Sequence, residues 1–227
     1  MASAQPLGIA TLASLGQVMV KTRESFGISH LLSASYLCRK VGELEKEHAT
    51  EQCGPFFLEI QALAVSAVFS AFAGLEAYAN EIFIDHIEYY PEQRPEVMEK
   101  LWETYERKDV LEKVEFALLL KGIPTDRGAN LWVQINALKS LRDALTHFKA
   151  EWSDEKGNHR KLSSQLQNKA VKSPFQPNAD LFPNGWISHG TVKWAVQSAT
   201  AFLLDLEEKL PPIYPKIRFR IDQLSNL

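Results

Sequence analysis

The sequence contains very little cysteine. Its 227 residues include only Cys38 and Cys53, and neither belongs to a Cys-x-x-Cys pair or to a Cys/His cluster. This scarcity excludes a disulfide-stabilised scaffold and a cysteine-based zinc site, and it is typical of free thiols in a reducing compartment. The chain also lacks a basic N-terminal segment followed by an apolar run, and no uninterrupted apolar stretch approaches about 18 residues. We therefore expect a cytoplasmic protein without a signal peptide or a membrane span.

Sequence features of several enzyme classes are missing as well. There is no Gly-rich phosphate-binding loop and no serine flanked by the glycines of a nucleophile elbow. His159 and His189 have no Cys or carboxylate partner at metal-ligand spacing. We therefore predict no metal site and no cofactor. The net charge is −3, so a surface that attracts nucleic acid or phosphate would have to be local.

Hydrophobic residues make up 45% of the chain, which is too high a share for a disordered polypeptide. They recur at intervals of three or four residues over most of the sequence, and this period predicts an all-α protein. Proline and glycine residues separate the expected helices. We place these helices at residues 30–48, 57–90, 95–106, 108–121, 126–152 and 190–209.

The composition changes twice along the chain and divides it into three parts. Residues 1–56 are expected to form an N-terminal leader and helical extension, residues 57–210 the main helical domain, and residues 211–227 a Pro-rich tail. Within the main domain, residues 153–188 are polar and interrupted by Gly, Asn and Pro, so we expect a long, partly irregular excursion there. We also expect a weak strand at residues 217–221.

Charge is distributed unevenly along the chain. Between Glu76 and Glu115 twelve acidic residues outnumber five basic ones, whereas between Lys139 and Lys172 eight basic residues outnumber four acidic ones. One interpretation of the basic stretch is a solvated loop of ordinary lysine content. The other is a basic rim around an anionic ligand, and the rim residues that we single out are Lys149, Lys156, Arg160 and Lys161.

The residues best suited to chemistry lie in the expected helix at 126–152. Arg142 and His147 are five residues apart, about 140° around a helix and about 7.5 Å along it, so they could flank one groove or meet across a two-fold axis. Asp143 and Lys139 continue the face of His147 backwards by one and two turns. A neighbouring carboxylate orients an imidazole and stabilises its protonated form, which suits general acid–base catalysis. With nine arginines and six histidines in the chain, this spacing by itself is a weak signal.

Glu76 falls on the apolar face of the expected helix at 57–90, with Asn80 one turn later. An unpaired carboxylate in such a position is costly, so we expect Glu76 to have a partner. An arginine of the helix at 126–152 is a natural partner. The alternative is a glutamate at the edge of the face that reaches solvent. The face itself is formed by Val65, Phe69, Phe72, Ala79 and Phe83.

Three stretches of the chain resemble the HEPN superfamily. NALKSLRDALTHFKAEW is similar to its signature helix, in which an arginine and an adjacent polar residue are followed a few residues later by a histidine. LEAYANEI resembles an earlier helix in which a Glu precedes an Asn, and VKWAVQSATAFL resembles the closing helix. The resemblance covers residues 57–210. It implies an all-α helical bundle that is frequently dimeric, here with an N-terminal helical extension.

The resemblance also implies a metal-independent endoribonuclease. His147 would act as general base or acid on the RNA 2′-hydroxyl, and Arg142 would stabilise the negative charge on the pentacoordinate phosphorus. Family members often have Asn where this chain has Asp143, which places a negative charge near the phosphate. The implied partners are RNA, a second copy of the chain and an antitoxin protein, in stress response, toxin–antitoxin control or phage defence. The supporting residues would be Asp143, Glu76, Asn80 and Lys139, and the RNA-binding residues Lys149, Lys156, Arg160 and Lys161.

Two non-catalytic interpretations use the same residues. Superfamily members that lack the Arg/His pair serve as binding or scaffolding modules, so Arg142 could hold a nucleotide phosphate or a partner protein without turnover. Alternatively, Arg142, Glu76 and Asp143 form a purely structural polar network. Aromatic side chains could stack on bases, although aromatic residues at helical spacing usually belong to the core. The candidates for stacking are Trp152, Trp186 and Trp194.

Overall fold

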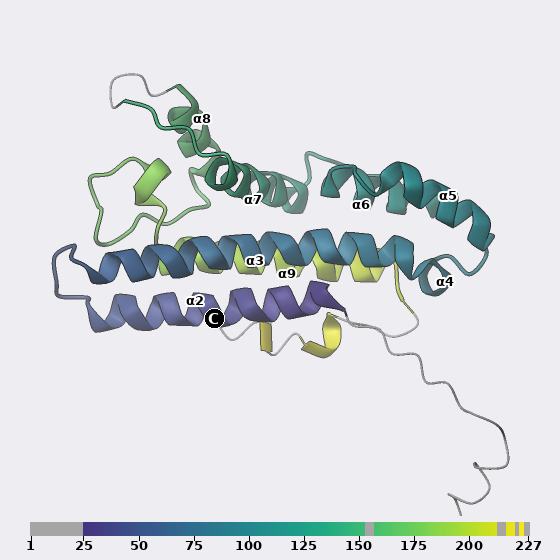
Figure 1. Ribbon diagram of the computed structural model, residues 1–227, viewed down its shortest axis with the longest axis horizontal. Coiled ribbons are helices and arrows are strands. Elements are labelled where there is room, and N and C mark those ends of the chain that lie inside the picture. The colour runs from purple at the N-terminus through teal and green to yellow at the C-terminus, as the bar shows by residue number, and fades with distance from the viewer. Residues whose placement is uncertain (1–24, 153–156, 213–216, 221–222, 225–227) are drawn as a thin grey trace, which may run out of the picture.

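The computed structural model describes residues 25–152, 157–212, 217–220 and 223–224. Within these ranges every regular element is a helix or a helical turn and none is a β-strand, so the expected all-α class is confirmed (Figure 1). The expected strand at 217–221 is wrong, because Arg218–Arg220 form a short 3-10 turn. The first 24 residues of the expected leader lie outside the described residues.

The helices follow one another along the chain with short connections, except on either side of α8, where the connections are longer. Two tight turns, η1 (Leu181–Gly185) and η2 (Arg218–Arg220), accompany them. Their bounds are α2 Phe26–Glu47, α3 Phe56–Ile84, α4 His86–Tyr89, α5 Pro95–Tyr105, α6 Val110–Leu120, α7 Asn130–Thr146, α8 Gly157–Leu166 and α9 His189–Lys209.

The long helix α3 is the centre of the fold. It packs against α2 and α9, and α5, α6 and α7 cover a further side of it (Figure 1). The core positions predicted on the last helix are confirmed, since all of them are buried against this arrangement. These positions on α9 are Val192, Val196, Ala199, Phe202, Leu203 and Leu206.

Glycines allow α2 and α3 to approach closely. A Cβ atom on Gly74 of α3 would lie 3.0 Å from Leu31 Cγ and 3.1 Å from the carbonyl oxygen of Gly27 on α2. A Cβ on Gly27 would in turn lie 3.1 Å from Tyr78 Cβ. This contact places α2, from the N-terminal segment 1–56, directly on the shared hydrophobic core.

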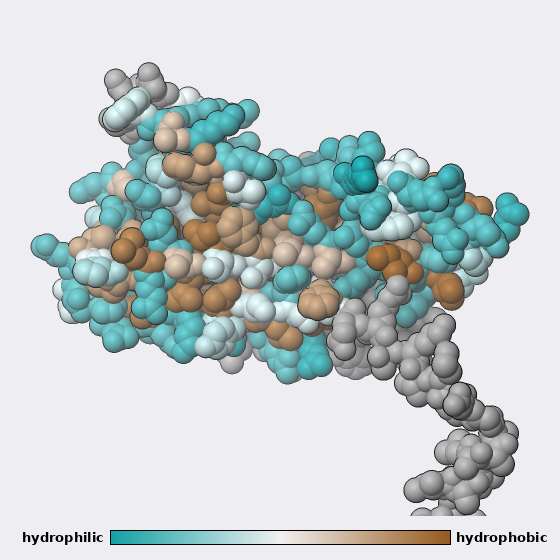
Figure 2. Space-filling model, viewed as in Figure 1, coloured by the Kyte–Doolittle hydropathy of each residue, from teal (hydrophilic) through white to brown (hydrophobic). Residues whose placement is uncertain are grey.

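The exposed side of α3 is a strip that the sequence pattern assigned to the interior. Phe72, Ala79 and Phe83 are buried as expected, but Phe69 is 36% exposed and Val65 is only half-buried. Because neighbours surround α3 on its other sides, solvent reaches one narrow row of side chains. Figure 2 shows apolar side chains gathered along α3 on this face. We call this row the α3 strip; it contains Leu58, Ala62, Val65, Phe69 and Ala73, and Glu76 follows it.

Helix α7 is shorter than the expected helix at 126–152. The chain before α7 forms a turn, in which Thr125 donates a hydrogen bond to Glu115 (3.0 Å) and Asp126 accepts one from the backbone N–H of Gly128 (2.8 Å). At the other end α7 stops at Thr146. The next apolar side chain, Phe148, leaves the helical path and packs against His159 and Phe182 (ring centroids 5.6 and 6.1 Å apart).

Two further boundaries differ from the sequence prediction. The helix expected at 57–90 is interrupted at Asp85 (φ −92°, ψ 31°), which separates α3 from the short α4. The segment at 153–188 contains a regular helix, α8, in its first half, and the irregular excursion follows it. The side chains of Leu162 and Leu166 are buried on one side of α8. Their spacing of four residues is a helical signal in a stretch otherwise dominated by polar residues.

Among the described helices, α3 alone is long and apolar enough to cross a membrane by length and composition, with 29 residues that include an 18-residue window of mean hydropathy 1.8. In this structure its buried side forms the middle of the hydrophobic core. The helices of protein interiors can satisfy the same criterion.

Candidate functional site

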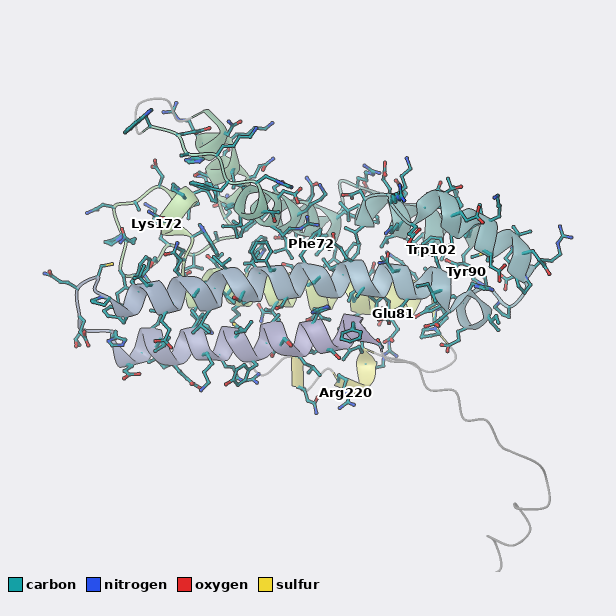
Figure 3. All side chains as sticks on the ribbon, viewed as in Figure 1. Phe72, Glu81, Tyr90, Trp102, Lys172 and Arg220 are labelled. Carbon is teal, nitrogen blue, oxygen red and sulfur yellow. The ribbon has the colours of Figure 1, made fainter. Side chains whose placement is uncertain are left out.

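Three contacts hold Arg142 in place on α7. Its Nη2 donates to Glu76 Oε1 on α3 (2.5 Å), and its Nη1 pairs with Asp143 Oδ1 (2.9 Å). The guanidinium carbon lies 4.1 Å from the centre of the buried Phe72 ring, which lies between α3 and α7 (Figure 3). The predicted pairing of Glu76 with an arginine of this helix is confirmed. Glu76 nevertheless reaches solvent, since its side chain is 48% exposed.

Asp143 is engaged by cations instead of by His147. Its carboxylate pairs with Arg142 and accepts a hydrogen bond from Lys139 Nζ (2.9 Å), which also lies 3.3 Å from Asp109 Oδ2. The hydrogen bond to Asp143 raises the pKa of Lys139, against the opposing effect of burial. Asp143 therefore does not orient the His147 imidazole as expected. Its carboxylate bridges Lys139 and Arg142 instead.

Asn80 lies one turn after Glu76 but bonds to a different cation. Its Oδ1 accepts a hydrogen bond from Lys113 Nζ on α6 (2.7 Å). Burial lowers the pKa of Lys113, and the negative charge of Glu76 opposes this shift. Lys113 did not figure in the sequence prediction, although a signal for it exists. Like Glu76, Lys113 is a charged residue at helical spacing from apolar ones. The apolar residues on its face are Val110, Val114 and Ala117.

The charges of this cluster balance. Asp109 joins it through Lys139 and also caps α6, where its Oδ1 accepts a hydrogen bond from the N–H of Leu111 (2.9 Å). Three acidic and three basic side chains result, so the cluster offers a phosphate a positioned guanidinium without excess positive charge. Its members are Glu76, Asp109, Asp143, Lys113, Lys139 and Arg142.

His147 lies at the C-terminal cap of α7, whereas the sequence analysis expected it to lie inside the helix. Its backbone (φ −112°, ψ 44°) has left the helix, although its N–H still donates to the carbonyl of Asp143 (2.8 Å). The angle of about 140° between Arg142 and His147 on an ideal helix therefore does not describe their side chains. The imidazole is exposed, and it makes no hydrogen bond or ion pair with any of the described residues. It is available to a ligand.

The basic residues predicted to bind RNA follow the same end of α7. Lys149 is exposed just beyond the helix, and Arg160 and Lys161 are exposed on α8. None of the three forms an ion pair within the described part of the chain. Lys156 lies outside the described residues. The positive charge absent from the cluster around Arg142 is thus available beside His147.

The three tryptophans considered for base stacking have different environments. Trp186 is buried, and its indole N–H donates to the carbonyl of Pro183 (2.8 Å). Trp194 on α9 donates to Gln134 Oε1 on α7 (2.7 Å). Trp152 is 77% exposed. Of the three, Trp152 alone presents a free ring face to solvent.

Comparison with known protein families, with curated proteins and with solved structures found no match to this chain. The resemblance to the HEPN superfamily therefore depends on the residues quoted above alone. Within the described ranges no three His, Cys, Asp or Glu side chains are placed to hold a metal ion.

Proposed function

We propose that this protein is a HEPN-type, metal-independent endoribonuclease that cleaves RNA to leave a 2′,3′-cyclic phosphate. We place it in the cytoplasm, in stress response, toxin–antitoxin control or phage defence. One observation carries the proposal. A single helix presents a guanidinium fixed by Glu76 and Phe72 and, at its end, the imidazole of His147, which the fold itself does not use.

The proposed reaction is a transesterification within the RNA. His147 removes the proton of a 2′-hydroxyl, and the 2′-oxygen forms a bond to the adjacent phosphorus. The bond from phosphorus to the 5′-oxygen breaks, and that oxygen takes up a proton. Arg142 stabilises the extra negative charge on the phosphoryl oxygens. Its fixed position favours this role, because a donor that is already oriented needs no reorganisation during the reaction.

A homodimer is part of the proposal. The reaction needs both a base and an acid, and His147 of a second copy would supply the acid. The α3 strip supports self-association, since it exposes Leu58 (69%) and Phe69 (36%) in a row that leads to Glu76. An antitoxin that covers the same row would block the site. RNA would approach over the basic side chains of Lys149, Arg160 and Lys161.

The test uses purified protein, mixed cellular RNA and an excess of EDTA. We expect cleavage by the wild type and loss of cleavage in the His147→Ala variant, whose change removes an exposed imidazole that the fold does not use. A suitable control is His30→Ala on α2, which removes a histidine outside the site. Equal inactivity of the wild type and His147→Ala on varied RNAs would contradict the catalytic role.

The ion pairs of Arg142 favour a second candidate, a non-catalytic module that binds a nucleotide or a protein. Glu76 and Asp143 both occupy the guanidinium, and a family member with Asn beside the arginine would carry one negative charge fewer. In this case Arg142→Ala weakens nucleotide binding while His147→Ala leaves it unchanged. A thermal-shift screen with nucleotides separates the two candidates, because bound ligand raises the melting temperature.

A further inference from the structure

Two adjoining cavities flank the end of α7 next to His147. The smaller, about 270 Å³, is lined by residues that include Trp152, His159 and Asp180. The larger, about 420 Å³, is lined by residues that include Gln61 and Val65 of α3 and Leu145 of α7. Four residues line both cavities, and we refer to the two cavities together as the groove. The shared residues are Phe148, Phe182, Pro183 and Asn184.

The aromatic side chains of this groove form a platform. Phe148 lies with its ring 5.6 Å from His159 and 6.1 Å from Phe182, and the His159 and Phe182 rings meet edge to face at 5.0 Å. Phe148 remains 52% exposed and Trp152 77% exposed. A solvated indole beside a cavity is an unusual use of the largest apolar side chain, and it offers a face on which a flat ring can stack.

The Glu151 carboxylate stabilises the position of this platform, and its hydrogen bonds to backbone N–H groups leave it unavailable to a ligand. Glu151 accepts hydrogen bonds from the backbone N–H groups of Asn158 (2.9 Å) and His159 (3.1 Å) at the start of α8. The His159 ring in turn bonds to the carbonyl oxygen of Lys149 (2.9 Å). These bonds hold Lys149 and Glu151, just before Trp152, against the start of α8.

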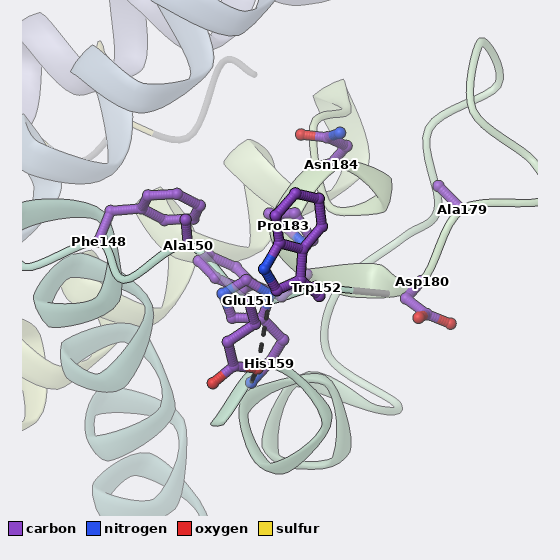
Figure 4. A pocket seen from close by; sticks show the side chains of 10 residues that line it. Phe148, Ala150, Glu151, Trp152, His159, Ala179, Asp180, Pro183 and Asn184 are labelled. Carbon is purple, nitrogen blue, oxygen red and sulfur yellow. Dashed lines mark hydrogen bonds and ion pairs between the residues drawn. The ribbon is translucent and has the colours of Figure 1, made fainter. Parts of the chain in front are cut away.

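Two carboxamides and the carboxylate of Asp180 also line the groove. Asn184 lies at the wall shared by both cavities, and Gln61 lines the larger one; neither side chain forms a hydrogen bond with another described residue. The Asp180 side chain points away from the other lining side chains (Figure 4). A carboxamide both donates and accepts, and it matches the N6/N7 edge of adenine with two hydrogen bonds.

Charge identifies the class of occupant. Two carboxylates line the smaller cavity: Glu151 is bonded to backbone N–H groups, and Asp180 points away (Figure 4). The basic side chains of Lys149, Arg160 and Lys161 adjoin the lining residues Ala150 and His159 in the chain, and all three are exposed. The groove therefore combines stacking faces, carboxamides and a basic border, which is the combination that binds single-stranded nucleic acid. A protein partner would be expected to meet apolar side chains without this border.

We propose that this groove holds an unpaired RNA base next to the phosphate handled by Arg142 and His147, with adenine as the best match. This inference rests on the proposed function for the position of the phosphate. Neither Arg142 nor His147 lines the cavities, but Leu145 and Phe148, on either side of His147 in the chain, both line the larger one, so the base and the phosphate would occupy neighbouring positions at the end of α7. The base stacks between Trp152 and Phe148, and Asn184 reads its edge.

The test measures binding separately from cleavage. Fluorescence anisotropy with labelled oligoadenylate and oligouridylate is suitable when all riboses carry a 2′-O-methyl group, because such strands have no attacking hydroxyl. Trp152→Ala should weaken binding of oligoadenylate roughly 5- to 150-fold, the range measured for base–aromatic contacts. Asn184→Leu should bring the affinities for the two strands closer together. Tyr36→Ala, which removes an aromatic ring of similar exposure on α2, should change neither affinity.

Several results would overturn the inference. If Trp152→Ala binds oligoadenylate as tightly as the wild type does, Trp152 does not stack on a base. The groove would then be assigned to a protein partner. An RNA duplex that binds as tightly as oligoadenylate contradicts recognition of an unpaired base. An unchanged preference for adenine in Asn184→Leu contradicts edge recognition by the carboxamide. If the wild type binds the base but does not cleave RNA, the proposed nuclease activity is refuted and the proposed base-binding groove is not.

Discussion

Replacing Arg142 by alanine tests whether this side chain is needed mainly for stability or mainly for function. The substitution removes the pairs with Glu76 and Asp143, whose side chains are 48% and 36% exposed, and the stacking on Phe72. Ion pairs of such exposure contribute about 0.2–1 kcal/mol each. A guanidinium over an aromatic ring contributes about 0.5–2 kcal/mol, depending on how far it is desolvated. The total loss should therefore be about 1–4 kcal/mol.

This magnitude is modest compared with the loss of a buried ion pair, which costs about 3–5 kcal/mol when one partner is removed. For a chain of this size each kcal/mol lowers the melting temperature by about 2–4 °C. Arg142→Ala should therefore melt about 2–16 °C below the wild type and remain folded at room temperature. Any loss of RNA cleavage at room temperature then reports on the site and not on unfolding.

A matched control is available in Arg127, which pairs with Glu115 through Nε (3.2 Å) and Nη2 (2.5 Å). Its side chain is 59% exposed. Arg127→Ala removes a comparable arginine–glutamate pair without an aromatic platform, so it should destabilise the protein less than Arg142→Ala does. Thermal and urea denaturation of both variants give the comparison. Equal losses would refute the contribution of Phe72, and unfolding of Arg142→Ala at room temperature would make Arg142 a structural residue.

Three other regions of the molecule give further predictions. Two backbone hydrogen bonds hold the pKa of Glu151 below its ordinary value of 4.5, so the stabilisation is complete above pH 4.5 and is lost as the pH falls through the lower folded value. Tryptophan fluorescence should change in that acidic window, and Glu151→Gln should abolish the change. Gly74→Ala should destabilise by about 1–3 kcal/mol in urea denaturation, because its Cβ would meet Leu31 and backbone, and a stabilisation would refute this close approach. Burial raises the pKa of the Cys38 thiol to about 11, so a thiol reagent should modify exposed Cys53 quickly and Cys38 only after denaturation; equal rates would contradict its burial.

The sequence pattern predicted long-range pairing well where a charge interrupted an apolar face. Glu76 was expected to need a cation from the helix that carries Arg142, and the two side chains meet across α3 and α7. The cost of leaving a carboxylate unpaired near a core explains why this inference was possible without a structure. The same argument applied to Lys113 would have found its bond to Asn80.

The end of α7 was harder to predict. His147 continues the helical pattern of the sequence, and nothing local to it, neither glycine nor proline, marks a stop. The helix ends because Phe148 packs onto His159 and Phe182, residues that follow it by 11 and 34 positions. Such contacts between distant segments cannot be read from the period of apolar residues. They also form the groove, which depends on the turn at Leu181–Gly185.

The most direct test of the central claim compares two forms of one RNA strand. One form has a 2′-hydroxyl at every position, and the other carries 2′-O-methyl groups throughout; both are incubated with wild-type protein in EDTA. We predict cleavage of the first strand to fragments whose 3′ ends are lighter by one water than ordinary phosphate ends, as mass spectrometry will show for a cyclic phosphate. The methylated strand should stay intact, and His147→Ala should cleave neither. Cleavage of the methylated strand, or of the first strand by His147→Ala, would contradict the account.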